Sequence, residues 1–328
     1  MTQDVPSLRA MVLAAGLGTR MRPLTNLIPK PLLPIANRPL LEYTFALLAG
    51  AGVREAVVNC HHLPEAFEKG LRRLDPSGLA LHVSREQRIL GTAGGLKRAE
   101  SFLSGGTFLL LNGDFLVDID LRRVLEFHTQ QKATATMVLL PDPTSGVLGV
   151  DPDGAIRRFI APRPADEPTG RLSCGFTGIH VLEPEVFRLI PPNRPWEINL
   201  QVYPVLLARG RRVCGFVHRG YWREGGSPAG YLAANREVLA GRAGSLTPRP
   251  GAGAATLAGS ACTPPVLVGP GVLAGPGVEI GPETVIGPEA RIGAGARIRR
   301  SVILEGADVP EGADLDGAVL FPEGRLDA

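Results

Sequence analysis

The chain has 328 residues, of which 44% are apolar, and a formal net charge of only +3. This length allows one large domain plus a smaller one, with a substantial core. Such a small charge does not support binding to nucleic acid or to an anionic membrane. The four cysteines are far apart and form no CxxC pair, so neither a zinc site nor a disulfide framework is predicted.

The N-terminus has no basic segment followed by an uninterrupted apolar one, and no apolar run in the chain reaches 18 residues. A signal peptide and a membrane span are therefore not predicted. Together with the unpaired cysteines, this pattern leads us to expect a cytoplasmic protein.

The first element is the apolar run 11–15, which predicts a buried strand, followed by the turn Gly16-Leu17-Gly18-Thr19-Arg20. Two glycines let backbone N–H groups approach an anion, and Arg20 adds a fork of donors suited to phosphate oxygens. The dinucleotide pattern GxGxxG is incomplete because position 21 is Met21, and no P-loop occurs. The two glycines alone would also fit an ordinary strand-to-helix turn.

Lys30 lies ten residues further on, between Pro29 and Pro31. The flanking prolines predict an extended, non-helical stretch that holds this side chain rigidly. The chain has only four lysines against thirty-one arginines. We therefore interpret Lys30 as a position that requires a compact ammonium charge rather than the planar guanidinium of arginine.

The next segments alternate between helical and strand-like patterns. We expect helices at 39–49, 65–71, 91–102 and 121–131, and strands at 56–59, 79–84, 108–111 and 134–140. The alternation predicts an α/β fold with a mostly parallel, Rossmann-like sheet covered on both faces. Ligands bind such folds at the carboxyl ends of the strands, where the glycine turn and Asp114 both fall.

The elements become shorter after residue 147. We expect strands at 147–151, 156–160, 174–182 and 213–218, and helices at 184–190, 198–209 and 231–239. We interpret this part as the second half of the same domain, which then spans residues 1–241. The segment 242–265 is rich in Gly, Ala and Pro and is predicted to be a linker.

A six-residue period fills the C-terminal part, 266–328. Small aliphatic residues recur at intervals of six, namely Val268, Ala274, Ile280, Ile286, Ile292 and Ile298, and a glycine follows each of the first five. This pattern predicts a parallel β-helix built from hexapeptide repeats, with about three coils. The register slips after Arg300. Because an open end of such a helix favours stacking on a copy, we expect a homo-oligomer.

The stretch GxGTRxRPLT followed by PKPLLP is much more specific than its glycines alone. It resembles the N-terminal motif of the sugar-1-phosphate nucleotidyltransferases. The hexapeptide tail and the stretches FTGIHVL and INLQVYP look most like the mannose-1-phosphate guanylyltransferase-like members of this family. The resemblance implies a left-handed β-helix. It also implies Mg²⁺-dependent transfer of a nucleotidyl group from an NTP, with GTP favoured, to a sugar-1-phosphate.

The resemblance also implies roles for single residues. Arg20 and the amides of 16–19 would contact the β- and γ-phosphates, and Lys30 the α-phosphoryl group. Asp114, after the strand 108–111, and Glu224, where many family members have Asp, would hold Mg²⁺. From the local sequence alone, Asp114 would also fit a turn aspartate and Glu224 a surface charge. The nucleotide-binding set is Ala14, Ala15, Gly16, Gly18, Thr19, Glu86, Gly91 and Thr92.

In the turn Gly91-Thr92-Ala93-Gly94-Gly95, small residues would admit a flat base, although a glycine-rich helix start fits the same letters. Glu86 is a candidate for reading the base, and a solvated loop is the commoner use of such a residue. His180, which alternates with apolar neighbours, is predicted to be structural.

The resemblance implies that Gly146, Arg163 and Gly178 contact the sugar phosphate. Relatives commonly have an acid-lysine-proline stretch where this chain reads Ala161-Pro162-Arg163-Pro164, so Arg163 would have to supply the cation. This departure leaves a non-catalytic regulatory subunit on the same fold as one alternative. Synthesis of UDP- or dTDP-glucose is a second alternative. A hexapeptide acyltransferase is disfavoured, because no histidine follows His218 to serve as a base.

Overall fold

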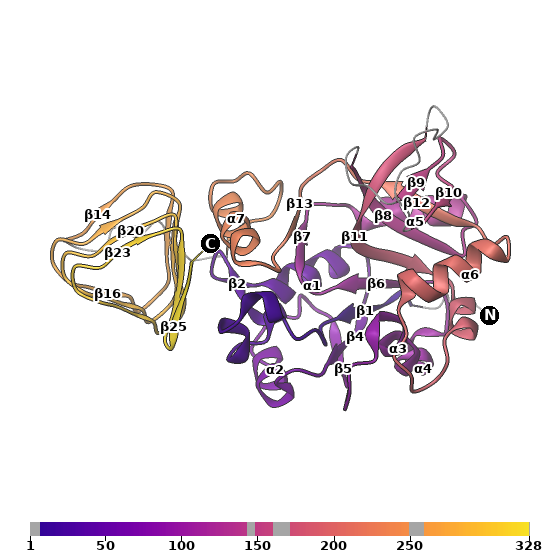
Figure 1. The fold of residues 1–328 in the computed structure, drawn as a ribbon, viewed down its shortest axis with the longest axis horizontal. Helices are drawn as coiled ribbons and strands as arrows, with labels where there is room; N and C mark the ends of the chain where they lie inside the picture. The colour runs from indigo at the N-terminus through magenta and orange to yellow at the C-terminus, as the bar shows by residue number, and fades with distance from the viewer. Residues whose placement is uncertain (1–6, 143–147, 160–170, 249–258, 328) are drawn as a thin grey trace.

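The computed structural model describes residues 7–142, 148–159, 171–248 and 259–327. A large α/β domain, the helix α7 (Pro228–Leu239) and a C-terminal β-helix follow one another along the long axis of the molecule (Figure 1). No helix in these described ranges is both long enough and apolar enough to cross a membrane.

The central sheet of the large domain has nine strands, and all of them except β10 and β11 point in the same direction. The order β10-β9-β11-β6-β1-β4-β5 forms the main path, and β8 pairs with both β11 and β12. The prediction of a mostly parallel sheet is confirmed. The strands are β1 (Arg9–Leu13), β4 (Glu55–Cys60), β5 (Ala80–Arg85), β6 (Phe108–Asn112), β8 (Ala135–Pro141), β9 (Leu148–Val150), β10 (Ile156–Arg158), β11 (Leu172–Leu182) and β12 (Val213–Val217).

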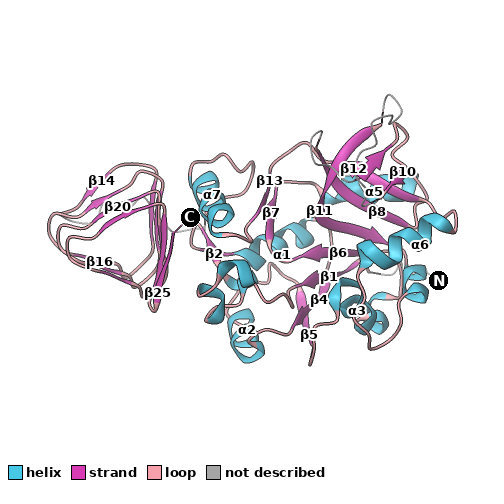
Figure 2. Ribbon diagram, viewed as in Figure 1, coloured by secondary structure: helices cyan, strands magenta, loops and turns pink. Residues whose placement is uncertain are grey.

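Helices cover both faces of this sheet (Figure 2). Strand β1 shows why, since Met11 packs into one core while Ala10 and Val12 pack into the other. An uninterrupted apolar run therefore serves both faces. One face is covered by α1 (Leu40–Gly50), α2 (Pro64–Leu71) and α5 (Leu121–Gln130). The other face is covered by α3 (Gly91–Arg98), α4 (Glu100–Leu103) and α6 (Tyr203–Ala208).

Three local predictions were wrong in detail. Residues Lys30–Leu32 form the 3₁₀ turn η3 rather than an extended stretch, with Leu33 N–H donating to Lys30 O at 3.1 Å. Proline fits the first positions of a helical turn, where its missing N–H is not needed. The expected helix 198–209 begins as the π turn η5 (Ile198–Val202) and continues as α6, and the expected helix 184–190 is the 3₁₀ helix η4 (Pro184–Leu189).

The C-terminal domain is a parallel β-helix, as its period predicted. Each of the six repeat residues lies in a short strand, and partners in successive coils stack 18 residues apart, as Val268 does on Ile286. From Ile286 onward, stacked partners lie 17 residues apart, as Ile286 and Ile303 do. This shorter coil accounts for the slip of the six-residue register after Arg300. The strand β14 already pairs with β17 and lies inside the segment that we expected to be a linker. Its small residues, Ala261 and Cys262, carry no aliphatic-glycine signal.

The coils form three sheets. Their strands are β14 (Ala261–Cys262), β17 (Glu279–Ile280), β20 (Arg297–Arg299) and β23 (Asp314–Asp316); β15 (Val266–Val268), β18 (Thr284–Ile286), β21 (Val302–Ile303) and β24 (Ala318–Phe321); and β16 (Leu273–Ala274), β19 (Arg291–Ile292) and β22 (Asp308–Val309). A last strand, β25 (Gly324–Asp327), pairs antiparallel with β24.

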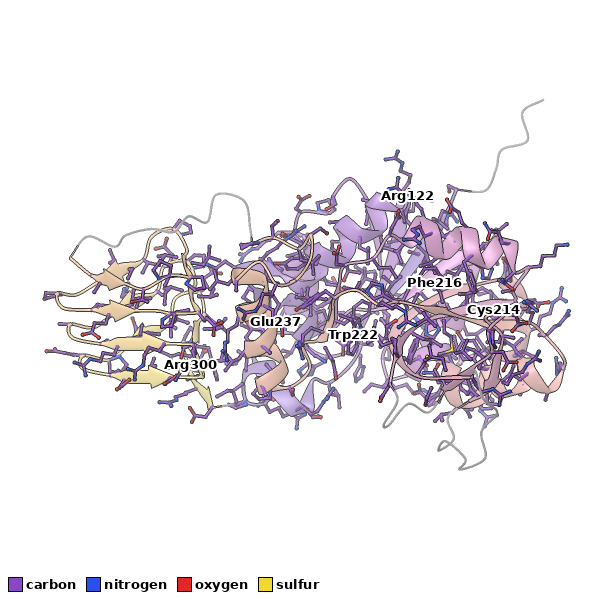
Figure 3. The ribbon with its side chains drawn as sticks, turned by 90° about the horizontal axis from the view of Figure 1, so that it is seen from above. Arg122, Cys214, Phe216, Trp222, Glu237 and Arg300 are labelled. Atoms are coloured by element: carbon purple, nitrogen blue, oxygen red, sulfur yellow. The ribbon has the colours of Figure 1, made fainter. Side chains whose placement is uncertain are left out.

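Helix α7 joins the two domains. One apolar cluster contains residues of α7, of the large domain and of the β-helix, including Leu33, Tyr231 and Val285. Figure 3 shows α7, with Glu237 labelled, between the stacked coils and the rest of the molecule. Arg236 on α7 also pairs with Glu283 of the β-helix at 2.5 Å. The two domains are therefore packed together through both apolar and charged contacts.

Candidate active site

The turn after β1 is shaped by one glycine in particular. Gly18 has φ +63°, a left-handed conformation that favours glycine, and an added Cβ would lie 2.9 Å from the Thr25 side chain. The Thr25 hydroxyl donates to Gly18 O at 2.8 Å and so holds the turn in place. Gly18 therefore shapes the backbone that carries Thr19 and Arg20, which form the 3₁₀ turn η1 (Thr19–Met21).

Lys30 and Asp114 meet at the carboxyl ends of the central strands. Asp114 follows β6, and its Oδ2 lies 2.5 Å from Lys30 Nζ. The lysine side chain is only 10% exposed, whereas that of Asp114 is 32% exposed. A buried cation is thus paired with a carboxylate that solvent or a ligand can still reach.

Glu224 reaches the same place through a short ribbon that the sequence did not reveal. Strand β13 (Trp222–Glu224) pairs antiparallel with β7 (Phe115–Val117), so Glu224 lies opposite Phe115. Next to this pair, Gly225 N–H donates to Asp114 O at 3.0 Å. Glu224 at the end of β13 and Asp114 directly before β7 therefore lie at the same end of this ribbon.

Arg20 forms an ion pair with Glu224. Its hydrogen bond to Glu224 and the negative charge of that residue raise the pKa of Arg20 above its usual value. Each of the two acids is therefore paired with one of the two predicted phosphate-binding cations.

Gly226 shows how tightly these groups converge. Arg20 Nη2, Lys30 Nζ and Glu224 Oε1 all lie within 2.8 Å of the point that a Cβ on Gly226 would occupy. Three of the four predicted catalytic residues, which are up to 204 positions apart in the chain, are therefore brought together around one glycine, and Asp114 joins them through Lys30.

A cavity of about 210 Å³ opens beside this cluster. Eight predicted site residues line it, namely Ala14, Ala15, Gly16, Lys30, Glu86, Gly91, Thr92 and Asp114. Gly18, Thr19, Arg20, Glu224 and Gly178 are not in its lining. Gly146 and Arg163 lie outside the described residues.

Glu86 is not in a solvated loop, the use that we considered commoner, but is 3% exposed at the wall of the cavity. Its Oε1 accepts from Asn59 Nδ2 at 2.7 Å, and its Oε2 accepts from Leu90 N–H at 3.0 Å. Asn59 in turn accepts from Ala14 N–H at 2.7 Å. A Cβ on Gly95 would lie 2.6 Å from Glu86 Oε1, so glycine is required there to admit the carboxylate.

The glycine-rich turn forms the start of α3, where Gly91 has φ +71°. Thr92 donates from its hydroxyl to Glu197 Oε2 at 2.8 Å, and Ala93 N–H donates to Trp196 O at 2.9 Å. The segment 196–197 therefore satisfies donors at the N-terminus of α3, and Glu197 lines the cavity.

Gly178 and His180 belong to β11. Gly178 has φ +93°, and a Cβ there would lie 2.9 Å from Asn112 Nδ2, so its contact is with a cavity residue rather than with the cavity itself. His180 is buried with Nδ1 2.5 Å from the Tyr203 hydroxyl. Burial lowers the pKa of His180 to about 3, so the ring is neutral and the predicted structural role is confirmed.

Sequence reasoning missed Asn59, Asn112 and Glu197, all of which line the cavity. Asn112 directly precedes the Gly113-Asp114 turn and had a local signal in its position at a strand end. Asn59 is likewise the last residue of the predicted strand 56–59. Glu197 had no such signal, because it lies in an irregular segment far from the other site residues in sequence.

The donor set around Asp114 and Glu224 fits a hard divalent cation. Within the described ranges, no three His, Cys, Asp or Glu side chains are grouped closely enough to form a complete protein metal site. Two carboxylates open to a ligand suit Mg²⁺ all the same, since it usually binds one or two carboxylates together with substrate phosphates.

Two family models match the chain. Residues 9–241 match the nucleotidyl transferase model, and residues 262–325 match the GMPPB C-terminal domain. The chain is also similar in fold to the crystal structure of HddC from Yersinia pseudotuberculosis, with a TM-score of 0.59 and 22% identity over 70% of this chain and 99% of that one.

Curated relatives show closer sequence similarity. The chain is 32% identical over 240 residues to a mannose-1-phosphate guanylyltransferase of Mycobacterium tuberculosis, covering 72% of this chain and 66% of the relative. It is 34% identical over 248 residues to a UTP–glucose-1-phosphate uridylyltransferase of Synechocystis, covering 71% of this chain and 63% of that relative. The matched region thus spans slightly less than two thirds of each relative. With the family model matching most of its length, this chain belongs to the nucleotidyl transferase family.

Proposed function

We propose that this protein transfers a nucleotidyl group from an NTP to a sugar-1-phosphate and releases pyrophosphate, and that its substrates are GTP and mannose-1-phosphate. The observation that carries the proposal is the convergence of Arg20, Lys30 and Glu224 around Gly226, with Asp114 paired to Lys30 beside the cavity. The names of several relatives support the same reaction.

The residues of the site suit in-line attack of a sugar-1-phosphate oxygen on the α-phosphorus. Arg20 and the amides of the 16–19 turn bind the β- and γ-phosphates, and Lys30 binds the α-phosphoryl group. Both cations now pair with carboxylates, so a triphosphate would exchange one anionic partner for another without leaving either cation unpaired.

Asp114 and Glu224, released from these pairs, would hold Mg²⁺, which neutralises phosphate charge when bound. The chain itself positions two anions that repel one another, and this positioning supplies much of the rate enhancement. No covalent intermediate on the protein is required.

The preference for guanine rests on Glu86. Each of its oxygens accepts one hydrogen bond from the protein, and a carboxylate has about four acceptor sites in total. Guanine presents two neighbouring donors, N1–H and N2–H₂, which match two carboxylate oxygens. Uracil and thymine present a single N–H between two carbonyl groups, and those carbonyls would face the carboxylate unfavourably.

A second function is favoured by one relative, the uridylyltransferase of Synechocystis. This second function would be the synthesis of UDP-glucose from UTP and glucose-1-phosphate, with synthesis of dTDP-glucose as a close variant. A non-catalytic regulatory subunit is a third candidate, because the sequence 161–164 lacks the expected acid and lysine. Retention of Arg20, Lys30 and both carboxylates disfavours it.

We further propose a homo-oligomer that associates through the β-helix. Leu273, on strand β16 of the first coil, is 64% exposed, which is high for a large apolar side chain. Sedimentation of the full chain tests this part. A dimer or larger species that dissociates on Leu273→Glu is expected, and a wild-type monomer at micromolar concentration would contradict it.

The decisive test of function is a panel of GTP, UTP and dTTP against mannose- and glucose-1-phosphate with Mg²⁺, read by pyrophosphate release. The highest kcat/KM is expected for GTP with mannose-1-phosphate, and removal of Mg²⁺ by EDTA should abolish turnover. Preference for UTP would favour the second function. Tight GTP binding without turnover on any pair would favour the regulatory subunit.

A further inference from the structure

The carboxylate of Glu197 lies in the wall of the cavity, and none of the roles above uses it. Its Oε2 accepts hydrogen bonds from the Thr92 N–H at 3.3 Å and from the Thr92 hydroxyl at 2.8 Å. Within the described ranges, Oε1 has no hydrogen-bond donor from the protein. One oxygen is therefore fixed by the protein, and the other remains available as an acceptor.

Glu197 is held in place by neighbouring groups of the protein. Trp196 O accepts from Ala93 N–H at 2.9 Å and from Gly94 N–H at 3.1 Å, and Ile198 N–H donates to the Thr92 hydroxyl at 2.8 Å. A side chain at Gly91 would overlap Oε1, so the glycine leaves that oxygen uncovered. An acceptor fixed in this way loses little conformational entropy on binding.

The surroundings of Oε1 narrow the chemistry of its partner. A phosphate is excluded as the partner of Oε1, because two anions at hydrogen-bonding distance would repel one another. Glu197 is not a third metal ligand with Asp114 and Glu224, since no such group of three exists among the described residues. The partner is therefore a neutral hydrogen-bond donor. The cavity lies beside Arg20 and Lys30, the proposed phosphate-binding residues, and the sugar rings of both substrates are attached to phosphates.

We infer that Glu197 Oε1 accepts a hydrogen bond from a ring hydroxyl of the substrates, either of the ribose or of the sugar-1-phosphate. This inference rests on the proposed function, because that function brings two sugar rings to the site. It makes Glu197 a substrate-binding residue that distinguishes a hydroxylated ring from its deoxy analogue. A site built to accept a hydroxyl discriminates strongly against analogues without one.

The test compares wild type with Glu197→Gln. The amide keeps the shape of the side chain and an oxygen for Thr92, but it presents an NH₂ where Oε1 now accepts. Kd is measured by calorimetry for GTP, 2′-deoxy-GTP, 3′-deoxy-GTP, mannose-1-phosphate and its ring-deoxy analogues, and kcat/KM is measured for the same compounds. Thr92→Val is the matched control, because it removes the hydroxyl that donates to Oε2, keeps the Thr92 N–H donor and does not alter Oε1.

Glu197→Gln should weaken binding of the fully hydroxylated partner roughly 10- to 100-fold, the usual range for a hydrogen bond to a charged group. The same variant should make no difference for the one analogue that lacks the bonded hydroxyl, as in a double-mutant cycle. If that analogue is a deoxy-GTP, the hydroxyl belongs to the ribose. If it is a deoxy sugar phosphate, the hydroxyl belongs to the second substrate. Thr92→Val should affect all compounds alike.

Two results would overturn the inference. One is an affinity within twofold of wild type for every compound. The other is an equal loss for every compound and analogue, which would show that Glu197 acts only by holding α3 through Thr92. Because Kd does not require turnover, an inactive wild type would count against the proposed function and not against this role of Glu197.

Discussion

The active site and the β-helix use charged residues in opposite ways. In the β-helix, charges point outward from regularly spaced strands and pair along the ladder, as Glu279 does with Arg297 at 3.4 Å, with more than half of each side chain exposed. In the active site, charges from three separate segments, those of Arg20, Lys30 and Glu224, converge around Gly226. Outward pairs contribute little to stability because water screens them. Convergent charges would be unstable unless each has a partner, which the Lys30–Asp114 and Arg20–Glu224 pairs supply.

The interior of the β-helix and the wall of the cavity also differ in composition. Stability of the β-helix comes from stacked aliphatic residues such as Ile280 and Ile298, which are almost fully buried. The cavity wall instead combines apolar residues such as Leu13 and Ile89 with buried polar groups such as Asn59 and Glu86, each of which has a hydrogen-bond partner. Substitutions in the site should therefore reduce activity, and substitutions inside the β-helix should reduce stability.

The largest effect is expected for Lys30→Met. Removing a charge that binds the reacting phosphoryl group should lower the rate of pyrophosphate release by about 10²- to 10³-fold. Lys69→Met is the matched control, since Lys69 is exposed on α2. Turnover by the Lys30 variant close to that of the control would contradict the assignment.

Ile298→Ala should separate stability from activity. Ile298 is fully buried inside the coils and outside the apolar cluster that contacts α7. The cavity should lower the free energy of unfolding of the β-helix by about 2–5 kcal/mol, as measured by urea denaturation. The kcat/KM of the folded variant at low temperature should stay within twofold of wild type. A tenfold loss of kcat/KM would mean that the interior of the β-helix affects the site.

Gly226→Ala tests the convergence itself. The added methyl group would lie within 2.8 Å of three charged atoms and must displace them. A misplacement of about 1 Å can cost on the order of 10²-fold in rate, which we expect in kcat/KM. In Gly225→Ala, the nearest atom to the new Cβ is 3.7 Å away, an ordinary contact, so this neighbour should retain activity. Equal activities for the two variants would show that the cluster tolerates expansion.

His180 gives a smaller effect that depends on pH. Since burial lowers its pKa from 6.5 to about 3, the unfolded chain binds a proton there that the folded chain does not. Stability should therefore fall as pH decreases from about 6.5 toward 3, by at most about 1.4 kcal/mol per pH unit. In urea denaturation at several pH values, His180→Gln should lack this contribution. Parallel pH profiles of the two proteins would rule out a neutral buried His180.

The smallest effect is expected for Asp308→Asn, on the outer face of the β-helix. Asp308 lies 3.9 Å from Arg291, and both side chains are more than 70% exposed. The free energy of unfolding should change by less than about 0.5 kcal/mol, and activity should not change. A loss above about 1 kcal/mol would show that the outward charges matter more than the comparison allows.

The same contrast explains what the sequence could predict. The β-helix was predictable because each coil repeats one pattern, so local spacing determines which residues face inward. The first strand and its glycine turn were predictable from an apolar run and from residue types. The resemblance, rather than spacing, linked Asp114 to Glu224, because their proximity depends on pairing between two three-residue strands.

Other features could not be predicted because tertiary contacts decide them. The turn at Lys30–Leu32 depends on Pro29 O accepting from Leu32 N–H, whereas proline flanks suggested an extended chain. Burial of Glu86 depends on Asn59, from a different strand. Glu197 enters the cavity only because the N-terminus of α3 needs acceptors, which its own neighbourhood in the sequence does not reveal.

The central claim is that Asp114 and Glu224 act as one unit with Arg20 and Lys30. The most direct measurement is the rate of pyrophosphate release for Asp114→Asn, Glu224→Gln and the double variant, with unchanged circular dichroism as the control for folding. Each single variant should be at least about 100-fold slower than wild type, and the double variant no more than about tenfold slower than the worse single, since residues that act together are non-additive. Near wild-type turnover in either single variant, or losses that multiply fully in the double, would contradict the account.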